Sequence, residues 1–103
     1  MNSGEKQLLL YLSRTAHKSQ KKLDKPLRRQ VKDALLSIAN DPLKAGKQLS
    51  TPLSGIYSHH ITYQGKEFRI AYQIDVEREC IWILMIGAHE NFYRRLKNLL
   101  YAS

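Results

Sequence analysis

Three extended segments follow one another in the second half of the chain, with only short turns between them. Residues 56–63, 67–75 and 80–86 are rich in β-branched and aromatic side chains, and turn residues occupy positions 64–66 and 77–79. Such short connections leave no room for a crossover helix, so neighbouring strands must run antiparallel. The sequence therefore predicts an antiparallel meander as the centre of the fold.

The sequence of the first half of the chain predicts a strand followed by two helices. Residues 7–12 form a continuous apolar run, which favours a short strand covered on both faces. Ser13 or Thr15 can cap a helix over residues 16–23. Pro26 suits the first turn of a second helix, because its missing N–H has no helical partner at that position.

The second helix and the C-terminal helix each show one apolar stripe. Apolar residues recur at helical spacing along residues 27–38, and again along residues 90–101. Residues 41–55 carry two prolines and two glycines and predict a long loop, while Gly87 is expected to end the last strand. The order is β-α-α-β-β-β-α, an α+β fold in which a helical hairpin packs on a mostly antiparallel sheet. We expect one domain over residues 1–103.

Charge narrows the classes of partner. The 103 residues include 17 Lys and Arg against 9 Asp and Glu, a net charge of +8. A field of that sign favours a polyanion such as nucleic acid, or an acidic protein. Residues 14–32 contain eight basic residues and a single acidic residue, Asp24. That run is either a phosphate-tracking face or a solvated helix surface.

No apolar run of the sequence is long enough to cross a membrane. The two longest runs have five and eight residues, whereas a spanning helix needs about 20. We therefore expect no membrane association and a cytoplasmic protein. The single Cys80 is expected to be a buried, reduced thiol.

Side-chain alternation along residues 67–75 gives the most specific functional expectation. The apolar residues of this strand take the face toward the helices, so Arg69 takes the other face. On the preceding strand, the parity of His60 places it on the same face as Arg69. His89 follows the last strand, and Tyr93 lies one helical turn beyond it. We expect an arginine, two histidines and a tyrosine to converge.

These residue types suit cleavage of a phosphodiester. Histidine transfers protons near neutral pH, a guanidinium stabilises phosphate charge, and tyrosine stacks on a base. In RNA the 2′-hydroxyl can be the nucleophile, so we expect no metal and no cofactor. His59 and His60 point to opposite faces of their strand and cannot easily ligate one ion together. The structural alternative is an ion pair of Arg69 with Glu67 or Asp75.

Three segments together resemble the RelE/ParE superfamily of toxins from toxin–antitoxin modules. They are residues 53–61 (LSGIYSHHI), 68–72 (FRIAY) and 83–93 (ILMIGAHENFY), and the resemblance extends over residues 7–100. It implies the fold order given above. It also implies a metal-independent endoribonuclease that cuts mRNA on the ribosome, or an inhibitor of DNA gyrase if the chain is of the ParE type. In either case it implies a cognate acidic antitoxin in a toxin–antitoxin hetero-oligomer.

The resemblance also implies roles for individual residues. Arg69 matches the phosphate-contacting arginine of RelE-type toxins, and His89 matches the proton-donating histidine of YoeB- and YafQ-like members. Tyr93 matches an aromatic residue near the C-terminal end. His60 takes the place of one of two RelE lysines, and Pro52 stands where YoeB-like members have a glutamate base. The identity of the general base is therefore open, with His60 as the candidate.

The sequence thus predicts a toxin ribonuclease with His60, Arg69, His89 and Tyr93 as catalytic residues. Further RNA contacts are expected from six polar or basic residues, namely Lys22, Arg28, Lys47, Ser58, His59 and Arg94. Two alternatives remain at this point. One is a non-nucleolytic gyrase inhibitor of the ParE type, and the other is a basic module that binds RNA or the ribosome without cutting it.

Overall fold

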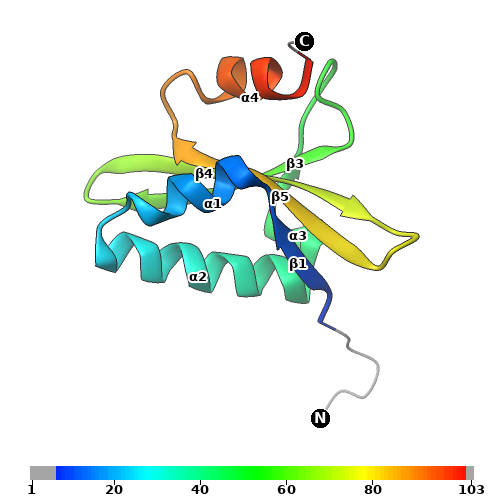
Figure 1. Ribbon diagram of the computed structural model, residues 1–103, viewed down its shortest axis with the longest axis horizontal. Coiled ribbons are helices and arrows are strands. Elements are labelled where there is room, and N and C mark those ends of the chain that lie inside the picture. Colours follow the sequence, from blue (N-terminus) through cyan, green and yellow to red (C-terminus); the bar gives the residue numbers. More distant parts are fainter. Residues whose placement is uncertain (1–6, 102–103) are drawn as a thin grey trace.

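The computed structural model describes residues 7–101 and shows a five-stranded sheet with helices on both faces (Figure 1). The strand order is β1-β5-β4-β3-β2, and all neighbours are antiparallel except β1 and β5. The strands are β1 (Leu9–Leu12), β2 (Lys47–Gln48), β3 (Ile56–Tyr63), β4 (Lys66–Asp75) and β5 (Cys80–Ala88). The predicted α+β fold with a mostly antiparallel sheet is confirmed.

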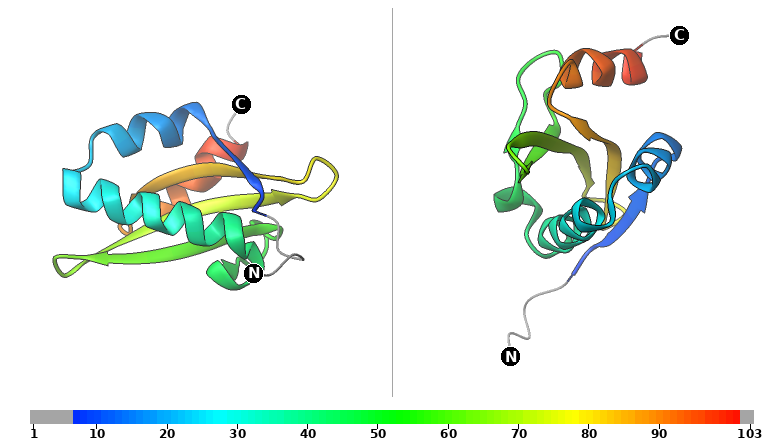
Figure 2. Two further views of the ribbon diagram at one scale, coloured as in Figure 1. Left: turned by 90° about the horizontal axis from the view of Figure 1, so that it is seen from below. Right: turned by 90° about the vertical axis from the view of Figure 1, so that its left-hand side faces the viewer.

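The helices form two layers, one on each side of the sheet (Figure 2). A hairpin of α1 (Arg14–Lys21) and α2 (Lys25–Asn40) covers one face, and α4 (Phe92–Tyr101) lies on the other. A short helix, α3 (Pro42–Ala45), follows α2. The predicted order β-α-α-β-β-β-α is therefore present, with α3 and β2 added between the second helix and the meander.

The middle strand, β4, contributes side chains to both hydrophobic cores. Ile70 is fully buried on the side of α1 and α2, in one cluster with Val31 and Ile38. Ala71 is fully buried on the opposite side, in a second cluster with Phe92 of α4. Full burial of an aliphatic or aromatic side chain contributes about 1.5–3 kcal/mol, so both helical layers are anchored through β4.

Ser13 connects the end of β1 to α1 and to β5. Its Oγ accepts a hydrogen bond from the N–H of Ala16 at 3.0 Å, which caps α1 as predicted, and donates to the carbonyl of Leu84 at 2.8 Å. Its own N–H donates to the carbonyl of Ile83 at 2.9 Å. One small side chain therefore fixes the direction in which the chain enters the helical hairpin.

A β-bulge interrupts the ladder between β4 and β5. Ala71 pairs with Met85 whereas Tyr72 pairs with Ile83, so Leu84 is an extra residue on β5. A bulge inserts one residue and changes which face the following side chains take. Its position beside the Ser13 contact places it at the junction of β1, α1 and β5.

The strand and loop expectations for residues 7–12 and 41–55 are partly wrong. β1 is an edge strand with Leu9 63% and Tyr11 46% exposed, so it is not covered on both faces. Residues 41–55 contain α3 and β2, because the hydroxyl of Tyr72 donates to the carbonyl of Pro42 at 2.5 Å and β2 pairs with β3. Long-range contacts of this kind leave no local pattern in the sequence.

The ends of three other elements also differ from expectation. Helix α1 starts two residues earlier than position 16, because Ser13 rather than Thr15 caps it. Gly87 does not end β5, because it pairs with Arg69 in the ladder. Helix α4 starts at Phe92 rather than at residue 90, after Asn91 adopts a positive φ of 57°.

Within residues 7–101, no helix combines the length and the apolar character needed to cross a membrane. Cys80 is buried and unpaired, as expected.

We predict that Ser13→Ala lowers the free energy of unfolding by about 1–2 kcal/mol, because it removes both a helix cap and a hydrogen bond to β5. Urea denaturation followed by circular dichroism measures the change. Ser37→Ala, at an exposed position of α2, is the matched control and should leave the midpoint within error of the unsubstituted chain. Equal midpoints for the two variants would contradict the role given to Ser13.

Candidate functional site

The carboxylate of Glu67, on β4, contacts three of the four predicted catalytic residues. Its Oε1 accepts a hydrogen bond from Nη2 of Arg69 at 2.9 Å and lies 3.4 Å from Nδ1 of His89. Its Oε2 lies 3.7 Å from Nδ1 of His60. The hydroxyl of Tyr93 accepts a hydrogen bond from Nη1 of Arg69. We call these five residues the Glu67 cluster, and the predicted convergence is present in it.

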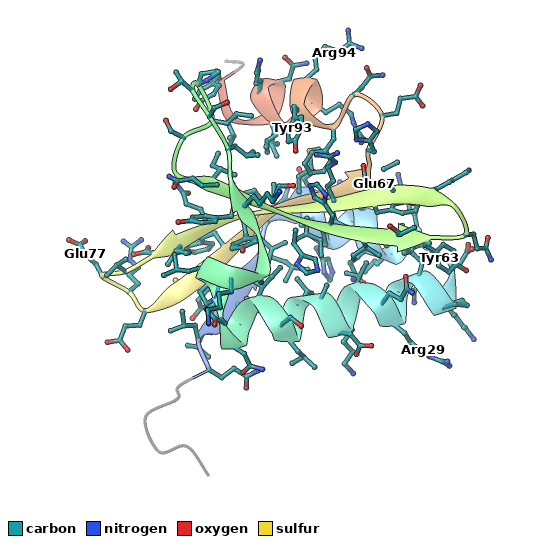
Figure 3. All side chains as sticks on the ribbon, turned by 180° about the vertical axis from the view of Figure 1, so that it is seen from behind. Arg29, Tyr63, Glu67, Glu77, Tyr93 and Arg94 are labelled. Atoms are coloured by element: carbon teal, nitrogen blue, oxygen red, sulfur yellow. The ribbon has the colours of Figure 1, made fainter. Side chains whose placement is uncertain are left out.

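Strand register and the start of α4 bring the Glu67 cluster together. His60 pairs directly with Arg69 across β3 and β4, so both side chains take the same face. Glu67 lies two residues before Arg69 and shares that face. The N–H of His89 donates to the carbonyl of Glu67 at 2.8 Å. Tyr93, in the first turn of α4, points from the helix toward the sheet (Figure 3).

Helix α4 covers the face that carries Arg69, so this face of the sheet is not open (Figure 2). Helix α4 packs Phe92 and Leu96 against Leu53, because its apolar stripe is buried on this side of the sheet. On this face Arg69 is only 9% and Ser58 only 2% exposed. Among the described residues, Nε of Arg69 and Oγ of Ser58 have no hydrogen-bond partner. The guanidinium is therefore held in one orientation between β4 and α4.

The environment separates the protonation states of Glu67 and His60. The hydrogen bond from Arg69 holds the pKa of Glu67 below its ordinary value, so the side chain is a carboxylate at neutral pH. Partial burial, reinforced by the positive charge of Arg69, lowers the pKa of His60 from 6.5. His60 is consequently neutral at pH 7 and can accept a proton.

Two of the six expected RNA contacts share the face of the Glu67 cluster. Lys47 on β2 pairs with Ser58 on β3, so both lie on the side of Arg69. Lys47 is exposed there, whereas Ser58 is buried. His59 has the opposite parity, and its Nδ1 lies 2.5 Å from the carbonyl of Ala45. His59 therefore does not join the cluster.

The other three expected RNA contacts lie away from the cluster. Arg94 is exposed on α4 and points away from the sheet (Figure 3). Lys22 follows α1 and Arg28 lies on α2, on the opposite side of the sheet. The guanidinium of Arg28 donates to the carbonyls of Lys21 at 2.8 Å and Leu23 at 3.2 Å, which ties the two helices together. Contact of these residues with RNA stays a prediction.

Glu67 is the functional candidate that sequence reasoning missed, since it was expected only as an ion-pair partner of Arg69. The signal that could have found it is the short hairpin at residues 64–65. This turn pairs Thr62 with Glu67, so Glu67 lies diagonal to His60 on one face. Within residues 7–101, no group of three or more His, Cys, Asp or Glu is arranged to hold a metal ion.

Solved structures with the same fold include toxins of toxin–antitoxin pairs. The RelBE2 toxin–antitoxin complex of Mycobacterium tuberculosis matches with 25% identity and a TM-score of 0.70, covering 82% of this chain and 100% of that chain. A mutant of the E. coli toxin RelE in the free state matches with 21% identity and a TM-score of 0.73, covering 95% and 100%. The fold is thus that of toxins of the RelE class.

A family model narrows this class. The model of ParE-like toxins of type II bacterial toxin–antitoxin systems matches residues 10–97, which is most of the chain. The chain therefore belongs to this family of type II toxins. A comparison with curated proteins finds no match.

We predict opposite shifts in the pKa of His60 for two variants of the cluster. Glu67→Gln should lower it further, because the carboxylate stabilises the protonated imidazole, and Arg69→Met should raise it, because a repelling charge is lost. Histidine NMR titration measures both shifts. A His60 titration that ignores both substitutions would show that these charges do not act on it.

Proposed function

We propose that the chain is a ribonuclease that cleaves mRNA on the ribosome, without a metal ion, and so inhibits translation. The observation that carries the proposal is the Glu67 cluster, in which one carboxylate holds two imidazoles and a guanidinium on one face. Attack of the 2′-oxygen on the adjacent phosphorus needs a base for the hydroxyl proton, an acid for the leaving oxygen and a cation for the phosphate oxygens. The cluster supplies one group for each of these tasks.

The reaction assigns opposite roles to the two histidines. His60, neutral at pH 7, takes the proton of the 2′-hydroxyl, and the resulting oxygen attacks phosphorus while the bond to the 5′-oxygen breaks. His89, whose side chain is 58% exposed, gives a proton to that leaving oxygen. The products are a 2′,3′-cyclic phosphate and a 5′-hydroxyl. Arg69 and Lys47 hold the phosphate in this scheme.

Glu67 and Tyr93 support these groups. Nδ1 of both imidazoles faces the Glu67 carboxylate, which leaves the other ring nitrogen of each for the substrate. The ring of Tyr93 lies 5.0 Å from Cζ of Arg69, at a position where it can stack on a base beside the phosphate. The sequence left the general base open, because Pro52 stands where YoeB-like members have a glutamate. In this scheme Glu67 is a carboxylate that positions the two histidines, and His60 is the base.

His60→Gln and His89→Gln are each expected to lower the rate of RNA cleavage by about 10²–10⁴-fold, whereas His17→Gln should leave it unchanged. Translation of a reporter mRNA, with mapping of the cut ends, measures the effect. The rate should fall on the acid side as His60 becomes protonated, with a midpoint below pH 6.5, and this limb should disappear in His60→Gln.

Undiminished cutting by an Arg69→Ala, His89→Ala double variant would remove the site assignment. The second candidate, a ParE-type gyrase inhibitor, is favoured by the match to the ParE-like family model. Inhibition of supercoiling by purified gyrase, without RNA cleavage by the same preparation, would replace the ribonuclease proposal by this one.

We further propose an acidic antitoxin as the partner, since two of the similar toxins were solved as toxin–antitoxin complexes. A groove of ≈ 450 Å³ between α1 and α2 suits such a partner. It has apolar residues at its base and basic residues along it, and its lining is Leu12, Gln20, Lys25, Arg28, Arg29, Val31, Lys32 and Leu35. An acidic amphipathic segment would match both the apolar base and the positive charge.

Charge reversal in this groove should weaken antitoxin binding. We expect Arg29→Glu, Lys32→Glu to lower the affinity for an acidic antitoxin by about tenfold or more, because charge attraction becomes repulsion. Calorimetry with the purified pair measures the affinity. Lys66→Glu, at an exposed residue outside the groove, is the single-charge control. Unchanged affinity of the double variant would exclude the groove as the binding surface.

A further inference from the structure

Gly87 leaves a space beside the Glu67 cluster that an arginine of another element fills. Gly87 on β5 pairs directly with Arg69 on β4, so this position belongs to the face of the cluster. A Cβ atom built on Gly87 would lie 2.9 Å from Nη2 of Arg95, which comes from α4. Side chains of directly paired residues have Cβ atoms about 4.5–5.5 Å apart. The Arg95 guanidinium therefore occupies the place of a cross-strand neighbour of Arg69.

The two guanidinium groups differ in what they can still bind. Arg69 is 9% exposed, and its two terminal nitrogens already donate to Glu67 and Tyr93. Arg95 is exposed, and its Nη2 donates to the carbonyl of Ala88 at 3.2 Å. A guanidinium has five N–H donors, so one bond to a carbonyl leaves most of the Arg95 fork for a ligand at the solvent side of the cluster.

We propose that Arg95 makes the direct contact with the phosphate oxygens that the scheme above gives to Arg69. Arg69 is then a positioning residue that orients Glu67 and Tyr93. This inference rests on the proposed function in taking an RNA phosphodiester as the ligand. A planar guanidinium matches two non-bridging phosphate oxygens bidentately, which a lysine cannot reproduce. A Cβ atom at position 87 would force the tip of the Arg95 side chain to shift from this place, whereas Gly87 leaves the place open.

The test uses the full chain and an RNA oligonucleotide with a 2′-deoxy substitution at the cleaved position, so that binding is measured without cleavage. Fluorescence anisotropy at several salt concentrations gives both the affinity and the salt slope. Each phosphate contact on a single strand contributes about 0.7 to that slope. We expect Arg95→Ala to weaken binding and to reduce the slope by this amount. Arg95→Lys should keep the slope but recover the affinity only in part.

Two further variants separate a placed guanidinium from general positive charge. Gly87→Ala should weaken binding as Arg95→Ala does, with an unchanged circular dichroism spectrum, because the added methyl displaces the guanidinium. Arg78→Ala, an exposed arginine in the turn between β4 and β5, is the matched control and should bind within error of the unsubstituted chain. Arg69→Met should keep the salt slope and lower the cleavage rate instead, with the shift in the pKa of His60 described above.

The outcomes distinguish this inference from the proposed function. An Arg95→Ala variant with unchanged affinity and slope, or a Gly87→Ala variant that binds normally, would overturn the role of Arg95. If the unsubstituted chain binds the deoxy-substituted RNA but leaves the reporter mRNA intact during translation, the ribonuclease proposal fails while the binding series still decides the phosphate contact. Absence of RNA binding by the unsubstituted chain would overturn the role of Arg95, while the reporter assay would still decide the proposed function.

Discussion

The alternation of side chains along β4 is the constraint on which the rest of the structure depends. Ile70 and its even-numbered neighbours bury against the helical hairpin, so the odd-numbered side chains must take the other face. On that face Ala71 packs against α4, and Glu67 and Arg69 belong to the group of catalytic candidates. A slip of one residue would exchange the two sets, so the hydrophobic core and the site are specified by the same register.

Glu67 makes the gathering of positive groups on this face possible. A guanidinium as little exposed as that of Arg69 is costly to bury unless an opposite charge and hydrogen bonds compensate it. Glu67 supplies the charge and Tyr93 supplies an acceptor on the other terminal nitrogen. The same carboxylate then faces His60 and His89, so the ion pair that stabilises the packed arginine also orders the two imidazoles.

Local patterns predicted the meander and the convergence of the site, and long-range contacts account for what was missed. The bounds of β3 and the shared face of His60 and Arg69 follow from alternation and one tight turn. Arg69 is buried because the apolar stripe of α4 packs on this face of the sheet. Helical spacing in the sequence predicts the stripe but not the surface against which it packs. Gly87 reads in sequence as a strand terminator, and its place under Arg95 becomes visible only when two distant segments are brought together.

Leu84, the single inserted residue in β5, determines which β4 residue each later residue of β5 pairs with. If pairing continued from Tyr72 and Ile83 without Leu84 as an extra residue, Ile86 rather than Gly87 would lie opposite Arg69. The side chain of Ile86 would then occupy the space of the Arg95 guanidinium, and that guanidinium could not lie against the sheet. The carbonyl of Leu84 accepts the hydrogen bond from the Ser13 hydroxyl. The inserted residue that is fixed beside the start of α1 therefore also sets which residue of β5 lies beneath the distant Arg95.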